Sequence, residues 1–304
     1  MKKDLELLLA SILLQHKKKI NNPISKKTQQ ELELLLGTSY FENRLYYKKN
    51  SSGKILYYFI GIDQFRAEFN ETMVAFPYVY YARGYAPTCF KAMKKALLEI
   101  KLSNPSIVNA LVCVDSSFGE FNNIIKKKSK LTAVELLGNV KKSIGLIKKK
   151  KMDKTLIGRA MRKKDIDFCV KRDINAHQND PTSRMNERFS MPDAFKFSRP
   201  FYKNLVKKKQ VIVAEKKIKN KKRILGAIGF FVNEDERMGL VASIYVDHLY
   251  QNQGVGTFLY LSVLKKFDQL KLVQFIGSST TSSVLMMANS IGRKEVGRVW
   301  ILKS

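Results

Sequence analysis

The sequence predicts an α/β fold of the mixed (α+β) kind, with a mostly antiparallel sheet flanked by helices. Along residues 155–304, apolar runs of strand length alternate with longer segments whose apolar residues recur at helical spacing. A turn with two glycines, Gly254 and Gly256, separates one such strand from one such helix. The hydrophobic content of 45% is typical of a protein with a packed core. A chain of 304 residues suffices for two domains of about 150 residues each.

The predicted elements of residues 155–304 follow one another as strand, helices, three antiparallel strands, helix, strand, helix and strand. The strands are expected at residues 156–161, 210–215, 224–232, 240–246, 272–278 and 298–302. The helices are expected at residues 165–174, 257–267 and 282–291. The last strand is expected to close the sheet of this half of the chain.

The glycine-containing turn after the strand at 240–246 reads Gln-Asn-Gln-Gly-Val-Gly-Thr from Gln251 to Thr257. Glycine lets the backbone come close to an anion because it has no side chain. The unpaired N–H groups of the first helical turn point toward the same place, with the positive end of the helix dipole behind them. A strand, a glycine-containing turn and a helix therefore predict a phosphate-binding loop.

This spacing, Q-x-x-G-x-G-T after a strand that ends at Val246, resembles the acetyl-CoA pyrophosphate loop of the GCN5-related N-acetyltransferase (GNAT) superfamily. The resemblance extends over residues 155–304, because the order of elements and the Gly292-Arg293 turn also fit that fold. It implies an acyltransferase that moves an acetyl group directly from acetyl-CoA to a primary amine. The amine belongs to a small molecule or to a protein, and no metal ion is implied.

The resemblance also implies which residues hold acetyl-CoA. Backbone N–H groups of the loop bind the pyrophosphate, and the pantetheine arm lies along the strand at 240–246 like an added strand. A backbone N–H near Ile244 or Tyr245 stabilises the oxyanion of the transition state. The expected cofactor-binding residues are Ile244, Val246, Gln251, Asn252, Gln253, Gly254, Val255, Gly256 and Thr257.

Three side chains are candidates for proton transfer: Tyr245, Glu215 and His248. Each has a structural alternative. Tyr245 is then a core aromatic of a central strand, Glu215 a residue at a strand end that is paired to a lysine, and His248 a residue that orders the loop. His177 is a fourth candidate. Relatives commonly carry a tyrosine on the last helix where this chain has Ala288, so a general acid is absent from that helix or differently placed.

The segment at residues 178–202 is the expected specificity element. Its large apolar side chains either line a broad pocket, which would admit an acyl group longer than acetyl, or form the core contacts of one irregular helix. These side chains are Met185, Phe189, Met191, Phe195, Phe197, Phe201 and Tyr202.

The N-terminal half contains a second passage of the same kind. A strand-like run at 72–76, a turn with Gly84 and Ala86, and a helix at 88–100 match the loop of the second half when Gly84 is aligned with Gly254. We therefore expect a tandem in which residues 1–150 form a degenerate GNAT-like or accessory α/β domain and residues 155–304 the GNAT domain. Pro87 has no N–H to offer a phosphate, so the first copy is expected to serve as scaffold, dimer surface or acceptor-site wall.

The formal net charge of +30 comes mostly from lysine, in short runs such as 148–151 and 207–209. Such a charge is either a compositional bias of solvated surfaces or a binding surface for a polyanion. Three cysteines and three histidines without metal-ligand spacing predict no zinc site. No apolar stretch reaches the roughly 18 residues that span a membrane, and the start of the chain predicts an amphipathic helix rather than a signal peptide. A cytoplasmic protein is expected, with a homodimer as one arrangement open to it.

Two other classes of function remain open from the sequence. One is a CoA-binding or ligand-binding scaffold with weak or no catalysis, which the missing tyrosine at Ala288 favours. The other is a basic protein associated with nucleic acid or the ribosome, for which affinity would fall steeply with salt.

Overall fold

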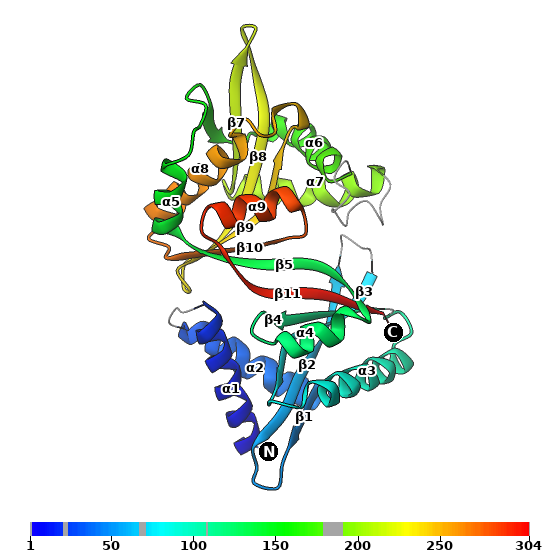
Figure 1. Cartoon of the computed structure of the whole chain (residues 1–304). Helices are drawn as coiled ribbons and strands as arrows, with labels where there is room; N and C mark the ends of the chain where they lie inside the picture. The colour runs from blue at the N-terminus through cyan, green and yellow to red at the C-terminus, as the bar shows by residue number, and fades with distance from the viewer. Residues whose placement is uncertain (1, 21–23, 67–70, 108, 179–190, 304) are drawn as a thin grey trace. The chain divides into compact units, whose positions relative to one another are not determined.

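The computed structural model describes residues 2–20, 24–66, 71–107, 109–178 and 191–303 (Figure 1). Packing divides the chain into two compact units. Unit 1 is Met1–Glu135 together with the C-terminal Glu295–Ser304, and unit 2 is Leu136–Lys294. The domains drawn from the sequence, 1–150 and 155–304, meet at the lysine run, whereas packing divides the chain after Glu135 and again after Lys294.

Unit 1 is built on a sheet with the strand order β1-β2-β3-β4-β11. Its elements are α1 (Lys2–Ile20), α2 (Lys26–Phe41), β1 (Leu45–Lys49), β2 (Ile55–Arg66), β3 (Glu71–Tyr81), α3 (Ala86–Ser103), β4 (Asn109–Asp115), α4 (Gly119–Lys126), the start of β5 (Ser129–Asn139) and all but the first residue of β11 (Lys294–Lys303).

Side chains alternate between the two faces of this sheet. Tyr58 and Ile60 of β2 pack with Leu8 and Ile12 of α1, so the first helix is amphipathic and contributes to the core, as expected. Phe59, between them on β2, packs on the opposite side with residues of α3 and α4. Helices α1 and α2 therefore cover one face of this sheet, and helices α3 and α4 cover the other face.

Unit 2 has the strand order β10-β9-β8-β7-β6. Its elements are the end of β5, α5 (Val140–Lys148), β6 (Ile157–Ala160), the 3₁₀ turn η1 (Lys163–Asp165), α6 (Ile166–Gln178), α7 (Met191–Lys207), β7 (Val211–Ile218), β8 (Lys221–Asn233), β9 (Met238–Val246), the 3₁₀ turn η3 (His248–Tyr250), α8 (Val255–Gln269), β10 (Gln274–Ser279) and α9 (Ser282–Ser290). Each strand and helix predicted between residues 155 and 291 is present, with bounds shifted by a few residues.

Two helical layers enclose the sheet of unit 2. Helices α5 and α8 pack on one face, where Leu259 and Phe267 of α8 meet Phe230 of β8. Helices α6 and α7 pack on the other face, where Val170 and Leu205 meet Val213 of β7 (Figure 1). Of the strand pairs in this sheet, β9 with β10 is parallel, and the pairs β8–β9, β7–β8 and β6–β7 are antiparallel. The predicted mixed, mostly antiparallel fold is confirmed.

The two units repeat one topology. In each, two antiparallel strands lead through a helix to a strand that pairs in parallel with the second of them: β2, β3, α3 and β4 in unit 1, and β8, β9, α8 and β10 in unit 2. Both parallel ladders have three residue pairs, ending at Phe76 with Val112 and at Leu240 with Ile276. This internal repeat supports the expected two-copy arrangement.

The C-terminal strand does not close the sheet of unit 2, and the expectation for 298–302 is wrong in this respect. Strand β11 pairs antiparallel with β4 in unit 1, from Gly297 opposite Asp115 to Lys303 opposite Asn109. The sequence pattern identifies a strand but not its partner, because hydrophobic alternation carries no information on which edge a strand joins. Unit 1 is therefore completed by the last residues of the chain.

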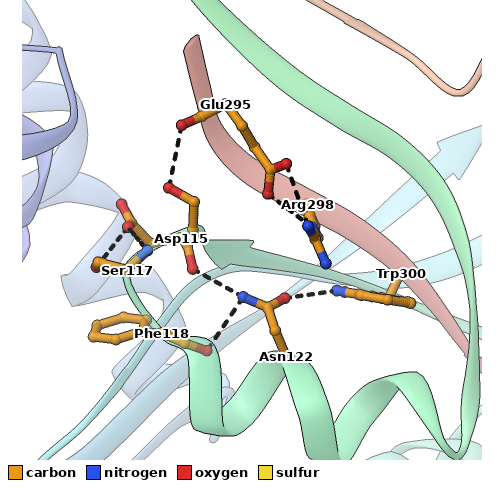
Figure 2. A network of polar contacts seen from close by, with 8 residues as sticks. Asp115, Ser117, Phe118, Asn122, Glu295, Arg298 and Trp300 are labelled. Atoms are coloured by element: carbon orange, nitrogen blue, oxygen red, sulfur yellow. Dashed lines mark hydrogen bonds and ion pairs between the residues drawn. The ribbon is translucent and has the colours of Figure 1, made fainter. Parts of the chain in front are cut away.

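A buried polar contact fixes β11 in place (Figure 2). The Asn122 side chain donates to the carbonyl oxygens of Asp115 and Phe118, at 3.1 and 3.2 Å, and accepts a hydrogen bond of 3.1 Å from Trp300 Nε1. Beside it, Arg298 is paired with Glu295 at 2.7 Å. Trp300 is 3% exposed and is the single tryptophan of the sequence, so its fluorescence reports on unit 1.

We expect Asn122→Ala to lower the free energy of unfolding of unit 1 by about 1–3 kcal/mol, because buried donors and acceptors lose their partner. Urea unfolding followed by Trp300 fluorescence measures this change. Asn123→Ala, exposed on the same helix, is the matched control and should leave the midpoint unchanged. Equal midpoints for the two variants would show that the contact does not hold the strand.

Candidate functional site

The parting of β9 and β10 creates the site. Their ladder ends at Leu240 and Ile276, and a cavity of about 460 Å³ opens beyond it, lined by β9 residues 241–246 on one side and by Gly277, Ser278 and Ser279 on the other. Further lining residues are Leu136, Lys150, Lys151, Ala176, Gln251, Asn252, Gly254, Gly256, Thr257, Tyr260, Thr281, Ser283, Val284, Met287 and Arg293. All of these residues belong to unit 2.

The loop at one end of the cavity is held by its own side chains. Asp247 caps η3 by accepting from the Leu249 N–H at 3.2 Å. Gln251 donates to the carbonyl oxygen of Val246 at 3.4 Å, and Gln253 donates to that of Leu249 at 3.0 Å. These two hydrogen bonds fix the path of the loop backbone. Gln251 also lines the cavity, whereas Gln253 does not.

Gly254 is the residue at which this loop becomes helix α8. Its φ of +81° lies in the left-handed region, which side chains disfavour. The N–H groups of the first helical turn, from Val255 to Thr257, have no acceptor within the helix. With the helix dipole behind them, they favour an anion at the mouth of the cavity.

Positive side chains lie at the same end. Lys150 and Lys151 line the cavity, and the Lys151 carbonyl oxygen would be 3.4 Å from a Cβ at residue 254. Lys150 Nζ donates to the Ser290 hydroxyl. In the sequence, the lysine run at 148–151 looks like a linker between two domains. Its position beside the glycine loop follows from the packing of α5 against α8, which the sequence does not show.

A chain of hydroxyl groups leads from the cavity into the core. Ser243 lines the cavity, and its hydroxyl is 3.3 Å from the hydroxyl of Tyr202, with either group able to donate. Tyr202 donates to the carboxylate of Asp173 at 2.9 Å. Burial, then the Asp173 charge, raises the pKa of Tyr202 far above its ordinary value, so this hydroxyl keeps its proton. We call these three residues the buried relay.

Gly229 of β8 makes room for the relay. A Cβ there would lie 2.8 Å from Ser243 Oγ and 2.9 Å from Leu205 Cδ1, which is too close for any side chain. The strand register shifts just after this residue, between Gly229 and Phe230, so that Ala242 lies in a bulge of β9. Bulges re-aim side chains near functional sites, and this one lies next to Ser243, which belongs to the cavity lining.

The predicted proton-transfer residues fall in different places. Tyr245 lies among the lining residues, and its ring is buried in the core with Cys169 and Val170. Burial, then the neighbouring Cys169 and Tyr202, raises the pKa of Tyr245 far above its ordinary value, so this hydroxyl also keeps its proton. His248 is 63% exposed in η3, 3.3 Å from Asp247, and it does not line the cavity.

Glu215 is held in an ion-pair cluster on the edge of the sheet. Arg159 Nη2 donates to its carboxylate at 2.5 Å, and Nη1 of the same arginine donates to Asp165 at 2.7 Å. Burial pushes the pKa of Asp165 up, but hydrogen bonds from Arg159 and the Arg162 N–H outweigh it and lower the pKa. Glu215 is absent from the cavity lining. The ion-paired alternative therefore fits this geometry, with arginine as the partner.

The variable segment is only partly described. Met185 and Phe189 lie outside the described residues, and the backbones of His177, Met191 and Phe197 lie in α6 or α7. The described side chains of this segment, Phe195, Phe201 and Tyr202, pack in the core between α6, α7 and the sheet. Ala288 is fully buried on α9, so that position offers no proton donor.

Residues 176–284 match the model of the acetyltransferase (GNAT) family. The chain carries a GNAT domain.

Solved structures share the fold. A GCN5-related N-acetyltransferase from Sphaerobacter thermophilus matches with 10% identity and a TM-score of 0.51, over 83% of this chain and 78% of that one. A conserved protein of unknown function from Staphylococcus epidermidis matches with 10% identity and a TM-score of 0.52, over 84% of this chain and 92% of that one. A Drosophila protein matches with 12% identity and a TM-score of 0.51, over 97% and 95%. A comparison with curated protein sequences gives no match.

In unit 1, a cluster of aromatic side chains lies beyond the last paired residues of β3 and β4. Tyr81, at the end of β3, packs against Phe118 and Phe121 with ring centroids 4.9 and 5.7 Å apart, and its hydroxyl accepts from the Phe121 N–H at 3.3 Å. Gly84 comes eight residues after the last paired residue Phe76, whereas Gly254 comes fourteen after Leu240. The first copy therefore has a shorter loop beside an aromatic cluster.

Within the described part of the chain, no helix is long and apolar enough to cross a membrane. The same residues contain no group of histidine, cysteine, aspartate or glutamate side chains that could hold a metal ion.

We expect Glu215→Gln to lower the free energy of unfolding by about 1–3 kcal/mol, because Arg159 loses a charged partner. Any catalytic turnover by the folded variant should stay within about twofold of that of the unchanged protein. Chemical unfolding and steady-state kinetics measure the two effects, with Glu234→Gln in an exposed turn as control. A variant of unchanged stability and strongly reduced kcat would instead assign Glu215 to catalysis.

Proposed function

We propose that unit 2 is an N-acetyltransferase that moves an acetyl group from acetyl-CoA to a primary amine. The observation that carries this proposal is the cavity between β9 and β10, which ends at the glycine loop and the N-terminus of α8. The cavity lining includes seven of the nine expected cofactor residues. These are Ile244, Val246, Gln251, Asn252, Gly254, Gly256 and Thr257.

Each part of acetyl-CoA finds a chemically suited surface. The N–H groups of Val255 to Thr257 would bind the pyrophosphate, and Lys150 and Lys151 would neutralise phosphate charge at the same end. The pantetheine arm, which carries two amide groups, would hydrogen-bond to the β9 main chain where no β10 residue pairs with it. The Thr257 hydroxyl lies 3.7 Å from Met287 Sδ, so this residue would contribute mainly its N–H.

In the reaction, the neutral amine nitrogen attacks the thioester carbonyl carbon, a C–N bond forms and the C–S bond breaks. A backbone N–H near Ile244 or Tyr245 would stabilise the oxyanion. At neutral pH the substrate amine is protonated, and before it attacks it would lose one proton to Ser243 Oγ while Ser243 gives its own proton to Tyr202 and Tyr202 gives one to Asp173. The CoA sulfur leaves as a thiolate and takes up the second proton that the amine nitrogen loses when the amide forms.

Acetyl-CoA binding to the glycine loop is tested by isothermal titration of the purified chain. We expect Gly254→Asp to weaken binding tenfold or more, because it adds a negative charge beside the pyrophosphate at a residue with φ of +81°. Gly84→Asp in unit 1, where φ is +82°, introduces the same backbone strain and charge away from the cavity and should leave affinity unchanged. Equal affinities for the two variants would contradict the assignment of the loop.

The buried relay is tested by Asp173→Asn and Tyr202→Phe. We expect each to lower kcat at neutral pH by about 10²-fold or more with KM for acetyl-CoA unchanged. The deficit should shrink as pH rises toward the pKa of the free amine, because the substrate then arrives already neutral. Asp167→Asn, exposed on the same helix as Asp173, is the control. A deficit that is constant across pH would indicate a purely structural role for the relay.

A further inference from the structure

Arg293 is a buried residue of the cavity lining, close to where β9 and β10 part. It is 4% exposed and belongs to the cavity lining. A Cβ on Gly277 would be 3.0 Å from Arg293 Nη2 and 2.9 Å from the carbonyl oxygen of Val241. The guanidinium group is therefore close to the last paired residues of the two strands, at the opposite end of residues 241–246 from the glycine loop.

All hydrogen-bond partners of this guanidinium are neutral. Nη1 donates to the Tyr260 hydroxyl at 3.0 Å, and Nη2 donates to the carbonyl oxygens of Leu136 and Gly277, at 2.7 and 2.9 Å. Nε has no partner although it is buried. Among the described residues, no carboxylate pairs with Arg293. The aromatic rings of Phe275 and Tyr260 lie beside the guanidinium group, with ring centroids 5.2 and 6.0 Å from Cζ of Arg293.

A buried charge without a counter-ion is costly for a protein. Burial lowers the pKa of Arg293, with Tyr260 acting in the opposite direction, yet guanidinium groups remain charged in proteins. The carbonyl oxygens of Leu136 and Gly277 require a hydrogen-bond donor at this place. A neutral side-chain amide, such as that of glutamine, would also supply N–H donors. The charge itself calls for an anionic group inside the cavity.

We propose that this cavity binds a substrate carboxylate at Arg293, carried either by the acyl group of the CoA donor or by the amine acceptor. The inference rests on the proposed function, which places the pantetheine arm along residues 241–246. An acyl group attached to that arm would extend from the level of Ser243 toward Val241 and Gly277, where Arg293 lies. The donor is therefore the source that the geometry favours, and a dicarboxylic acyl-CoA is the corresponding class of substrate.

The first arm of the test compares CoA thioesters on the unaltered protein. Succinyl-CoA and butyryl-CoA have four-carbon acyl groups that differ by a terminal carboxylate against a methyl group. We expect isothermal titration to show succinyl-CoA binding at least tenfold more tightly than butyryl-CoA. Arg293→Met should bind the two within about twofold of each other, whereas Lys294→Met, which removes an exposed neighbouring charge, should keep the preference.

The second arm titrates β-alanine and propylamine into the protein saturated with CoA. A preference for β-alanine that Arg293→Met removes, with no preference among the thioesters, would place the carboxylate on the acceptor. If CoA binds but neither arm shows a carboxylate preference, the inference is overturned and the proposed function stands. If no CoA compound binds, the proposed function itself fails. The comparisons on the unaltered protein decide the question even if Arg293→Met does not fold.

Discussion

The ladder between β9 and β10 has three residue pairs, and the strands then separate. Backbone N–H and C=O groups of a buried strand require partners, so this separation can exist only where something other than a neighbouring strand supplies them. Arg293 supplies part of this need by donating to Gly277 on β10 and Leu136 on β5. The facing main chain of β9 borders the cavity, where a ligand with amide groups is well suited to supply the rest.

Unit 1 shows what the same topology becomes when the separation is filled from within. Its ladder has the same length, but Tyr81, Phe118 and Phe121 pack together where the other copy is open. The resulting core is completed by β11, whose Trp300 contacts Asn122 on α4. The expectation that unit 1 serves as a scaffold remains a prediction. This is consistent with the sequence, in which Pro87 removes an N–H from the first turn of α3.

The sequence predicted what local patterns encode. The strands and helices of unit 2 follow from periodicity, and the turn before α8 follows from the positions of Gly254 and Gly256, because these features depend on neighbouring residues. The partner of β11 could not be predicted, since pairing is decided by tertiary packing. The relay was missed for the same reason: Asp173, Tyr202 and Ser243 lie on three different elements. Tyr202 looked apolar in a run of aromatic residues, and Arg293 looked like part of a turn, with nothing in the local sequence to signal its burial.

Hydrogen–deuterium exchange of the full chain with and without CoA tests the central claim most directly. The separation of β9 from β10 predicts slower exchange on CoA addition at residues 241–246 and 255–257, whose N–H groups would gain acceptors. Residues 77–86 of unit 1, at the corresponding place, should exchange at the same rate with and without CoA. Unchanged exchange along β9, or protection confined to residues 77–86, would contradict the assignment of the cleft as the cofactor site.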